Sequence, residues 1–279
     1  MFLWAICFPL INLGITYAPP MTFAFLRAFS AGLVLLFIAI ILNRPKIGGK
    51  SNWIYLILIG ITATSIGFYG MFNGGKLVSP GIATVLSNSQ PLFAAFLAAI
   101  FLHEKLNKMQ ICGIAIGFIG IVFISIPALT LRSSNLVGIG YILYSALGIA
   151  ISNVILKYVS RSIDILTAMG WQLLVGSIPL GILSVITEDP FSVMWSLPFM
   201  VSLFLLSTFG TALPFVIWFY LLTQTELTKL NIYTFLTPVF GVLMGIFLYN
   251  EQLGSWHIAG IVVITLSIGI VSQTKGNID

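Results

Sequence analysis

Several polar and charged side chains of this 279-residue chain lie inside long apolar runs, where they could bind a solute. Arg27 is the one basic residue well inside such a run, and its guanidinium could bind a carboxylate through two N–H groups or extend to a membrane surface. Ser87, Asn88 and Gln90 lie inside another run, where amides are costly unless they bond within the protein or meet water. These residues predict a polar cavity inside an apolar bundle, although each could instead bond a neighbouring helix.

The acidic residues avoid the interior of the apolar runs. All seven lie in connections, near the ends of runs or at the C-terminus: Glu104, Asp164, Glu188, Asp189, Glu226, Glu251 and Asp279. Proton-driven exporters commonly use a carboxylate deep in the membrane, so this pattern favours facilitated diffusion or exchange and leaves coupling through acids at helix ends as the alternative. Glu104 and Glu251 each close an apolar run just before the next one begins. We interpret both as structural, since a carboxylate stabilises a helix N-terminus.

Motifs for catalysis or metal binding do not occur in the sequence. His103 and His257 lie at the ends of apolar runs without a second ligand at metal-binding spacing, and Cys7 and Cys112 lie inside runs as packing residues. There is no H-E-x-x-H helix, no pair of intramembrane aspartates and no glycine-rich phosphate loop. We therefore expect no metal, no cofactor, no enzymatic activity and no ATP-driven transport, with an intramembrane enzyme and a non-transporting receptor or scaffold as the alternatives.

The composition requires most of the surface to contact lipid. The chain is 59% hydrophobic and 7% charged, whereas a soluble domain carries about 25% charged residues. A membrane-spanning helix needs about 20 apolar residues, and ten runs come close to this length: 2–18, 22–42, 53–72, 81–102, 110–127, 136–157, 163–186, 197–222, 229–249 and 256–273. The first run lacks a basic leader and a cleavage site, so we expect a retained helix. The net charge of +5 comes from basic residues scattered in short connections, which argues against nucleic acid as a partner.

The two halves of the sequence resemble each other. A shift of 147 positions aligns Pro91 with Pro238, Glu104 with Glu251 and Leu106 with Leu253, and a shift of 145 aligns Asn12 with Lys157 and Arg27 with Gln172. Since each half holds five runs, the second half must enter the bilayer from the opposite side. We therefore predict an all-α integral membrane protein with ten transmembrane helices in two inverted five-helix repeats, residues 1–130 and 131–279. Inverted repeats are typical of secondary transporters that bind solutes near the bilayer midplane.

The distribution of Lys and Arg predicts the orientation of the helices. In the ten-helix layout, nine basic residues fall on one side of the membrane. Three fall on the opposite side, namely Arg27, Lys76 and Arg132. Because cytoplasmic loops carry the excess of positive charge, the nine-residue side and both termini should be cytoplasmic. We expect a multi-pass protein of the plasma membrane, which would be the inner membrane in a bacterium.

Two stretches of this chain resemble the EamA-type branch of the drug/metabolite transporter superfamily. They are "WAICFPLINLGITYAPPMTFAFLRAFSAGLVLL" from Trp4 and "GKLVSPGIATVLSNSQPLFAAFLAAIFLHEKL" from Gly75, and a second copy of the latter begins at Thr228. The resemblance covers essentially the whole chain and implies ten helices in two inverted repeats that move small metabolites, such as amino acids or drug-like solutes. Asn12 stands where many relatives carry a lysine, so a lysine-dependent contact with substrate is not implied here.

The polar and aromatic residues of the helix interiors form the predicted substrate site. Pro91 and Pro238 should bend their helices around it, because each removes a backbone hydrogen bond; a packing kink is the alternative. The predicted substrate-binding residues are Asn12, Arg27, Tyr69, Asn73, Ser87, Asn88, Gln90, Tyr144, Trp171, Gln172, Thr211, Trp218, Thr234 and Thr237. For the aromatic residues, contact with lipid or with the core is the alternative.

Amides and aromatic rings with little fixed charge favour a neutral or zwitterionic solute. The sequence thus predicts a secondary transporter that moves an amino acid or similar metabolite by alternating access, through facilitated diffusion or exchange. A proton-coupled drug or metabolite exporter is the alternative. The expected partners are the solute and the lipid bilayer, and the chain should act as a monomer or homodimer.

Overall fold

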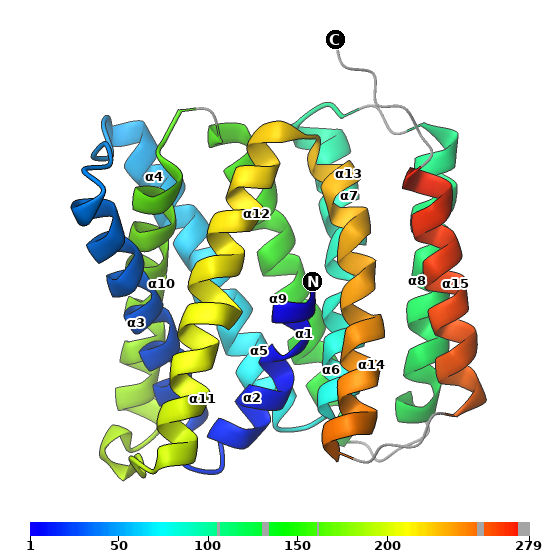
Figure 1. Ribbon diagram of the computed structural model, residues 1–279, viewed down its shortest axis with the longest axis horizontal. Helices are drawn as coiled ribbons and strands as arrows, with labels where there is room; N and C mark the ends of the chain where they lie inside the picture. Colours follow the sequence, from blue (N-terminus) through cyan, green and yellow to red (C-terminus); the bar gives the residue numbers. More distant parts are fainter. Residues whose placement is uncertain (105–106, 130–133, 161, 250–253, 273–279) are drawn as a thin grey trace.

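Apolar helices make up the structure, which is a computed structural model and describes residues 1–104, 107–129, 134–160, 162–249 and 254–272 (Figure 1). The helices of the first half are α1 (Phe2–Ala5), α2 (Cys7–Gly14), α3 (Pro20–Ile41), α4 (Lys50–Ile59), the π-helix η1 (Gly60–Ile66), α5 (Gly67–Gly75), α6 (Pro80–Ser87), α7 (Gln90–Phe101) and α8 (Lys108–Leu129). Those of the second half are α9 (Ser134–Val159), α10 (Ile165–Thr187), the 3-10 turn η2 (Pro190–Ser192), α11 (Leu197–Ser207), the π-helix η3 (Thr208–Ala212), α12 (Leu213–Gln224), α13 (Leu227–Ile232), the 3-10 turn η4 (Tyr233–Phe235), α14 (Leu236–Tyr249) and α15 (Ser255–Ser272).

Five stretches of helix are long and apolar enough to cross a membrane: Pro20–Ile41, Lys50–Gly75, Leu136–Val159, Ile165–Thr187 and Leu197–Gln224. Where side chains are described, shorter apolar helices cover Phe2–Gly14, Gln90–Phe101, Lys108–Phe123 and Ser255–Ser267. Large apolar side chains such as Phe37, Ile40, Val185 and Ile186 are exposed on the outside of the bundle, which is the pattern of a surface in contact with lipid. The prediction of an all-helical membrane protein is confirmed at this level, and the ten-span layout stays a prediction.

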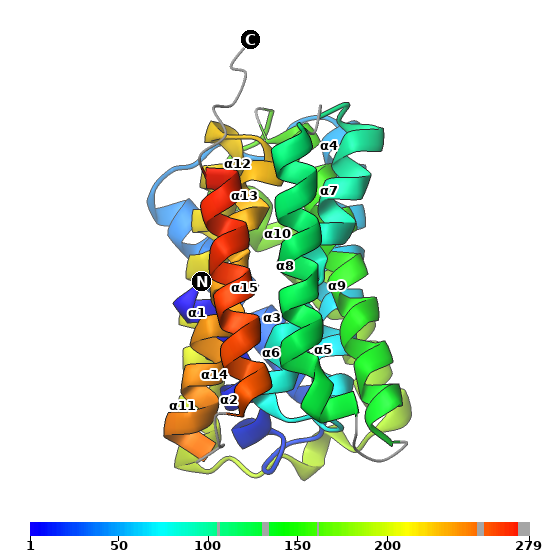
Figure 2. The same ribbon diagram turned by 90° about the vertical axis from the view of Figure 1, so that its right-hand side faces the viewer.

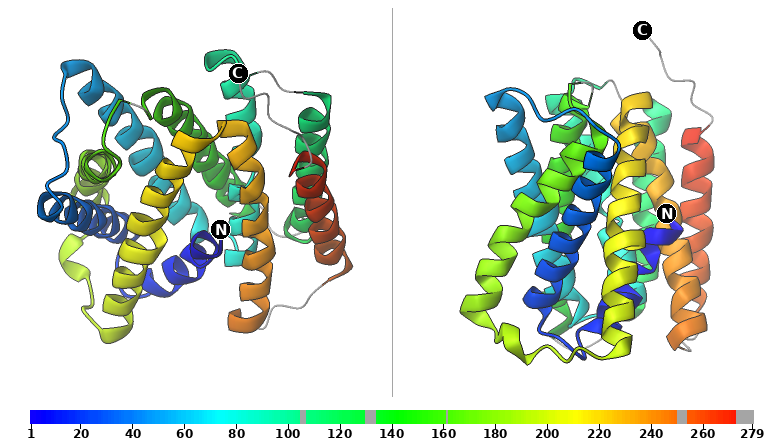
Figure 3. Two further views of the ribbon diagram at one scale, coloured as in Figure 1. Left: turned by 45° about the horizontal axis from the view of Figure 1, so that its top comes forward. Right: turned by 60° about the vertical axis from the view of Figure 1, so that its left-hand side comes forward.

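Helices from the two halves of the chain pack directly against each other. α3 lies along α10, and α8 lies along α15, as the turned views in Figures 2 and 3 show. Between these outer pairs, α6 contacts α14, α7 contacts α13, and α9 packs against η1 and α5. The described core of the protein is therefore shared by both halves.

Several of the described helical stretches are interrupted, and four of these interruptions occur at matching places in the two halves. η1 separates α4 from α5, and η3 separates α11 from α12 at the corresponding place in the second half. α6 ends at Ser87, and Pro91 is the second residue of α7. The stretch from α13 to α14 is interrupted by η4, and Pro238 is the third residue of α14. Both prolines thus stand in a first helical turn, where the missing N–H would have no intrahelical partner.

Glu188 joins the end of α10 to the start of α3. Its carboxylate accepts hydrogen bonds from the backbone N–H groups of Met21 and Thr22, at 3.0 Å each. These N–H groups belong to the first turn of α3 and have no partner within the helix, so the carboxylate satisfies them and favours the positive end of the helix dipole.

Glu104 makes the same kind of contact at the opposite end of the bundle. Its two oxygens accept from the N–H groups of Leu227, at 2.9 Å, and Thr228, at 3.1 Å, which open α13. The residue therefore caps a helix, as the structural interpretation requires, but the helix lies in the other half of the chain and does not follow Glu104 in sequence. Glu251 lies outside the described residues.

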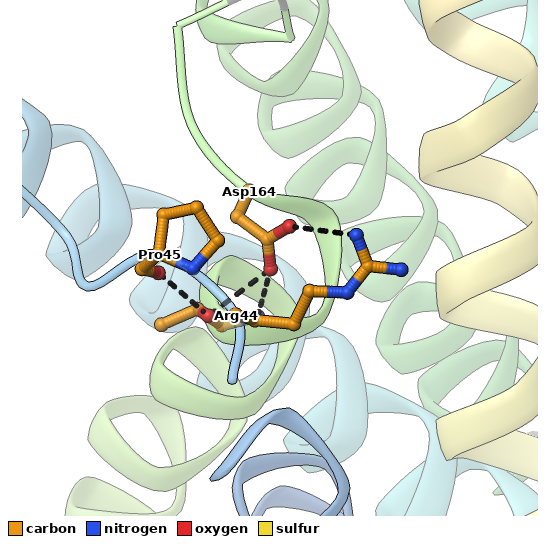
Figure 4. A network of polar contacts seen from close by, with 4 residues as sticks. Arg44, Pro45 and Asp164 are labelled. Atoms are coloured by element: carbon orange, nitrogen blue, oxygen red, sulfur yellow. Dashed lines mark hydrogen bonds and ion pairs between the residues drawn. The ribbon is translucent and has the colours of Figure 1, made fainter. Parts of the chain in front are cut away.

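A third polar contact ties the α3–α4 connection to the start of α10 (Figure 4). The carboxylate of Asp164 accepts from the backbone N–H of Thr167, at 3.1 Å, and caps α10. Its other oxygen lies 3.8 Å from the guanidinium of Arg44, and the Thr167 hydroxyl donates to the carbonyl of Pro45. The charged groups of these three contacts thus lie at helix ends, where water can reach them.

α10 crosses η1 with the two backbones nearly in contact. A Cβ atom built on Gly176 would lie 2.3 Å from the carbonyl oxygen of Gly60, and one built on Gly60 would lie 2.6 Å from the carbonyl oxygen of Gln172. The hydroxyl of Ser65 uses this proximity to donate to the carbonyl of Gly176, at 2.7 Å. Only glycine fits at this crossing.

We predict that Gly176→Ala lowers the stability of the folded protein by about 1–3 kcal/mol, because the added methyl group overpacks the crossing. The measurement is the midpoint of thermal unfolding in detergent, together with the yield of monodisperse protein. Gly140→Ala on α9 is the matched control, since a Cβ atom there would have no neighbour within 4 Å. Equal unfolding midpoints for the two variants would contradict the close crossing.

Candidate functional site

A cavity of about 120 Å³ lies at the centre of the bundle, among the interrupted helices. Because about 10–15 Å³ of such volume holds one water molecule, the space can take several waters or a small metabolite. Side chains from both halves of the chain line it: Trp4, Cys7, Phe8, Arg27, Ile59, Ala63, Phe68, Met71, Ser87, Asn88, Gln90, Ile149, Ser152, Asn153, Leu156, Met169, Gln172, Phe215, Trp218, Thr234 and Thr237.

Arg27 reaches the cavity from α3 and is almost fully buried, with 2% of its surface exposed. Its Nε donates to the hydroxyl of Thr211, at 2.8 Å, and its Nη2 donates to the carbonyl of Gly210, at 3.2 Å, and to the sulfur of Cys7, at 3.5 Å. The Cζ atom lies 4.3 Å from the ring centroid of Phe68, a cation–π contact. Hydrogen bonds and the aromatic face thus hold the guanidinium among helices α2, α3 and η3.

Gln172 occupies the position that corresponds to Arg27 in the second half. It projects from α10 and is buried, and its side-chain oxygen accepts from the hydroxyl of Thr64, at 2.9 Å. Thr64 lies in η1, and Thr211, the partner of Arg27, lies at the corresponding place in η3. Each π-helix therefore presents a threonine to the polar residue of a helix from the opposite half. π-helical turns inside longer helices frequently occur at functional sites.

Aromatic rings form one wall of the cavity. The indole Nε1 of Trp218 donates to the side-chain oxygen of Asn153, at 3.0 Å, which fixes the ring between α12 and α9. The ring of Trp4 packs edge-on against Trp218, with centroids 5.2 Å apart. Phe68 and Phe215 extend this apolar surface. A planar or aliphatic part of a solute could pack here.

Another part of the lining comes from the breaks between α6 and α7 and between α13 and α14. Ser87, Asn88 and Gln90 line the cavity at the first break, and Thr234 and Thr237 line it near the second. The amide of Gln90 lies 3.4 Å from the side-chain oxygen of Asn231, and the Thr234 hydroxyl donates to the Asn231 carbonyl, at 2.6 Å. Non-helical backbone at membrane depth is tolerated where it is buried in protein or lines a wet cavity, and both breaks meet this condition.

The structure brings eight of the predicted substrate-binding residues to the cavity: Arg27, Ser87, Asn88, Gln90, Gln172, Trp218, Thr234 and Thr237. Thr211 lies behind Arg27 as its hydrogen-bond partner. Five other predicted residues do not line this cavity: Asn12, Tyr69, Asn73, Tyr144 and Trp171.

These other residues have different neighbours. The Asn73 amide donates to the carbonyl of Tyr69 one turn earlier, and the Tyr69 ring packs against Tyr141. Trp171 packs edge-on against Trp53 on α4, and Tyr144 is 47% exposed.

Sequence reasoning missed several lining residues. Trp4, Cys7, Phe8 and Phe68 carry no signal that distinguishes them from core residues of an apolar helix. Ser152 and Asn153 do carry one, since they form a polar pair inside the last third of the apolar run 136–157. An amide at that depth needs a partner, and here the partner is Trp218.

The lining of the cavity combines hydrogen-bonding groups with apolar surface. Among the described residues that line it, Arg27 is the only charged one, and none is a carboxylate or a histidine. Hydroxyl and amide groups can hydrogen-bond a polar solute, while the aromatic wall packs against its apolar part. The arrangement is that of a binding site with a few polar groups in a mostly apolar pocket.

Comparison with known proteins gives one consistent family. The model of the EamA-like transporter family matches residues 1–126 and 136–273. A WAT1-related chloroplastic protein of Arabidopsis thaliana is 32% identical over 267 residues, which cover 92% of this chain and 64% of that protein, so the chain spans less than two thirds of its length. The uncharacterized transporter YvbV of Bacillus subtilis strain 168 is 30% identical over 274 residues, which cover 97% of this chain and 88% of that protein.

Two further comparisons concern function and fold. A probable amino-acid metabolite efflux pump of Salmonella typhimurium is 25% identical over 276 residues, which cover 96% of this chain and 90% of that protein. A crystal structure superposes on 97% of this chain and 92% of its own, with a TM-score of 0.78 and 16% identity. At this identity the superposition supports the fold alone.

We predict that Thr211→Val lowers the free energy of unfolding by about 1–3 kcal/mol, because the isosteric side chain leaves a buried charged donor without its acceptor. Thermal unfolding in detergent provides the measurement. Thr208→Val in the same π-helix is the control, since the Thr208 hydroxyl donates only to the carbonyl of Phe204 in its own helix. A loss no larger than that of the control would show that the Arg27–Thr211 bond contributes little.

Proposed function

Because the chain belongs to the EamA-like transporter family, we propose that its central cavity carries a small neutral or zwitterionic metabolite, such as an amino acid, across the membrane by alternating access. The family match confirms the resemblance to the drug/metabolite transporter superfamily that the motifs indicated. The family and the relatives named above are transporters and not enzymes.

The observation that carries the proposal is the construction of the cavity from equivalent positions of the two halves. Arg27 with Thr211, and Gln172 with Thr64, are corresponding contacts, and each joins one half to the other across a π-helix. In the proposed layout ten spans form two inverted five-helix repeats. Exchange of the conformations of the two halves would then turn a cavity open to one side into a cavity open to the other, as in other transporters with inverted repeats.

The chemistry of the lining supports a neutral or zwitterionic solute. The cavity combines amides and hydroxyls with an aromatic wall, and it offers one fixed positive charge among the described residues. A dianionic sugar phosphate would require more cationic groups. The efflux pump of Salmonella typhimurium carries amino-acid metabolites by its name, which agrees with this class of solute.

The absence of a carboxylate from the described lining supports facilitated diffusion or exchange. Glu104, Glu188 and Asp164 cap helices at the ends of the bundle, so their charges stabilise helix termini and lie away from the cavity. A proton-coupled exporter that uses an acid at a helix end is the second candidate.

We predict that the purified protein in proteoliposomes moves solutes down their gradients, from a panel of labelled amino acids, nucleosides and polyols. Cancelling the solute gradient should abolish net flux, and a pH gradient should drive no accumulation. Asn88→Ala and Gln90→Ala should raise the concentration for half-maximal flux by about 10-fold, since each removes polar contacts to the solute. Folded yield should change little.

The control for proton coupling is Glu104→Gln, which removes the charge of a helix cap outside the cavity. This variant should lower the yield of folded protein without creating or removing a dependence on pH. Uphill accumulation driven by a proton gradient, and lost in well-folded Glu104→Gln protein, would replace facilitated transport by the proton-coupled mechanism.

We predict that the α3–α4 connection faces the cytoplasm and the α10–α11 connection the outside. These connections lie at opposite ends of the bundle (Figure 1). Gly48→Cys and Phe191→Cys, each in a Cys112→Ser background, place a thiol on each side, and Phe191 is 94% exposed. In intact cells an impermeant thiol reagent should label only the Phe191→Cys variant, and the parent background should stay unlabelled because Cys7 is buried. Labelling of both variants from outside would contradict the layout.

A further inference from the structure

One nitrogen of the Arg27 guanidinium has no hydrogen-bond partner among the residues that the structure describes. Nε and Nη2 donate to Thr211, Gly210 and Cys7, whereas Nη1 is buried and makes no hydrogen bond. An unsatisfied donor on a buried charged group is costly, and native structures retain such groups where a ligand, ion or water completes them. Arg27 lines the central cavity, so a molecule held in that cavity is the available partner.

The charge of Arg27 is also uncompensated. Arg27 is not part of an ion pair among the described residues, and the ion pair found there joins Arg44 to Asp164 at the end of the bundle. Within the described lining of the cavity no second charge faces the guanidinium. A buried cation without a counter-charge destabilises the protein, and an anion bound beside it relieves that cost.

A purely structural role does not require this charge. At the corresponding position of the second half, the neutral amide of Gln172 also contacts a π-helix threonine, although there the Thr64 hydroxyl donates and the amide oxygen accepts. The tie between Arg27 and η3 uses Nε and Nη2, and the ring of Phe68 covers one face of the guanidinium. Gln172 also contacts a π-helix threonine, but it has no charge. Arg27 therefore supplies two further features, the unpaired Nη1 and a net positive charge.

From these observations we infer that Arg27 determines substrate specificity by binding a carboxylate. The inference rests on the proposed transport function and narrows it: the solute carries one carboxylate, and an oxygen of that group accepts a hydrogen bond from Nη1. Charge-assisted bonds of this kind are among the strong ones in proteins. A single cation in the cavity favours a monocarboxylate over a dianion. The aromatic wall of Trp4 and Trp218 would then hold the apolar part of the solute.

The test compares matched solutes on the purified, unaltered chain. Phenylalanine is measured against phenylalaninamide and 2-phenylethylamine, and leucine against leucinamide and 3-methylbutylamine, by the shift in unfolding midpoint as each is titrated. At least one acid should bind about 10-fold or more tightly than its amide and its amine, because only the acid pairs with the guanidinium. This comparison needs no mutation, so it does not depend on the folding of a variant.

The variant Arg27→Gln places at position 27 the residue found at the corresponding position 172. The folded fraction of this variant should bind acid and amide with similar, weak affinity. The control Gln90→Ala should weaken the binding of both while it keeps the preference for the acid. A structural role for Arg27 would lower stability in Arg27→Gln but would leave the preference for the acid intact.

Three outcomes would overturn the inference. They are equal binding of acid and amide to the unaltered chain, binding of neither acid, and an acid preference that persists in folded Arg27→Gln. Transport of a labelled nucleoside or polyol together with any of these outcomes would leave the proposed function standing and remove only the role of Arg27. No flux for any solute of the transport panel would count against the proposed function, and the binding comparison would still decide the role of Arg27.

Discussion

A polar group at membrane depth is costly unless it has a partner within the protein or its cavity, and this constraint accounts for the construction of the bundle. Hydrocarbon offers no hydrogen bonds to backbone or side chain. The helix breaks at Ser87–Gln90 and at η4 are accordingly placed around a central cavity, where polar side chains can satisfy freed groups. The same constraint explains why the amide of Asn153 meets the indole of Trp218 and why Thr64 meets Gln172.

Charged groups follow the same rule in two different ways. Glu104 and Glu188 lie at opposite ends of the bundle and cap helices of the other half, so each both stabilises a helix terminus and holds the halves together. Arg27 is instead buried at the centre, with hydrogen bonds on Nε and Nη2 and an aromatic ring over its face. Glu104 and Glu188 thus lie where water can reach them, whereas Arg27 places a cation at the cavity.

The two halves are related but not identical, and the difference lies at the centre. The threonines of η1 and η3 correspond, whereas their partners are a neutral amide in one half and a guanidinium in the other. Two equal halves would give a cavity whose chemistry is the same on both sides. Because Arg27 stands where the other half has Gln172, one side of the cavity carries a positive charge. This charge would orient a zwitterionic solute within the proposed site.

Composition and pattern determined the class of this protein. A chain with 7% charged residues cannot cover itself with a water-facing surface, and the repeated Pro-x-Phe and Glu-x-Leu motifs identified two related halves and the EamA-type resemblance. Residues such as Asn88, Gln90 and Gln172 could be placed at the cavity from sequence, because amides inside an apolar run need partners. Tertiary structure decided the rest. It showed that Glu104 caps a helix of the other half, that Tyr69 and Trp171 pack elsewhere, and that Trp4, Phe68 and Asn153 line the cavity. The physical reason is that an apolar helix presents similar side chains on every face, so only its packing against neighbours decides which of them meet lipid, core or solute.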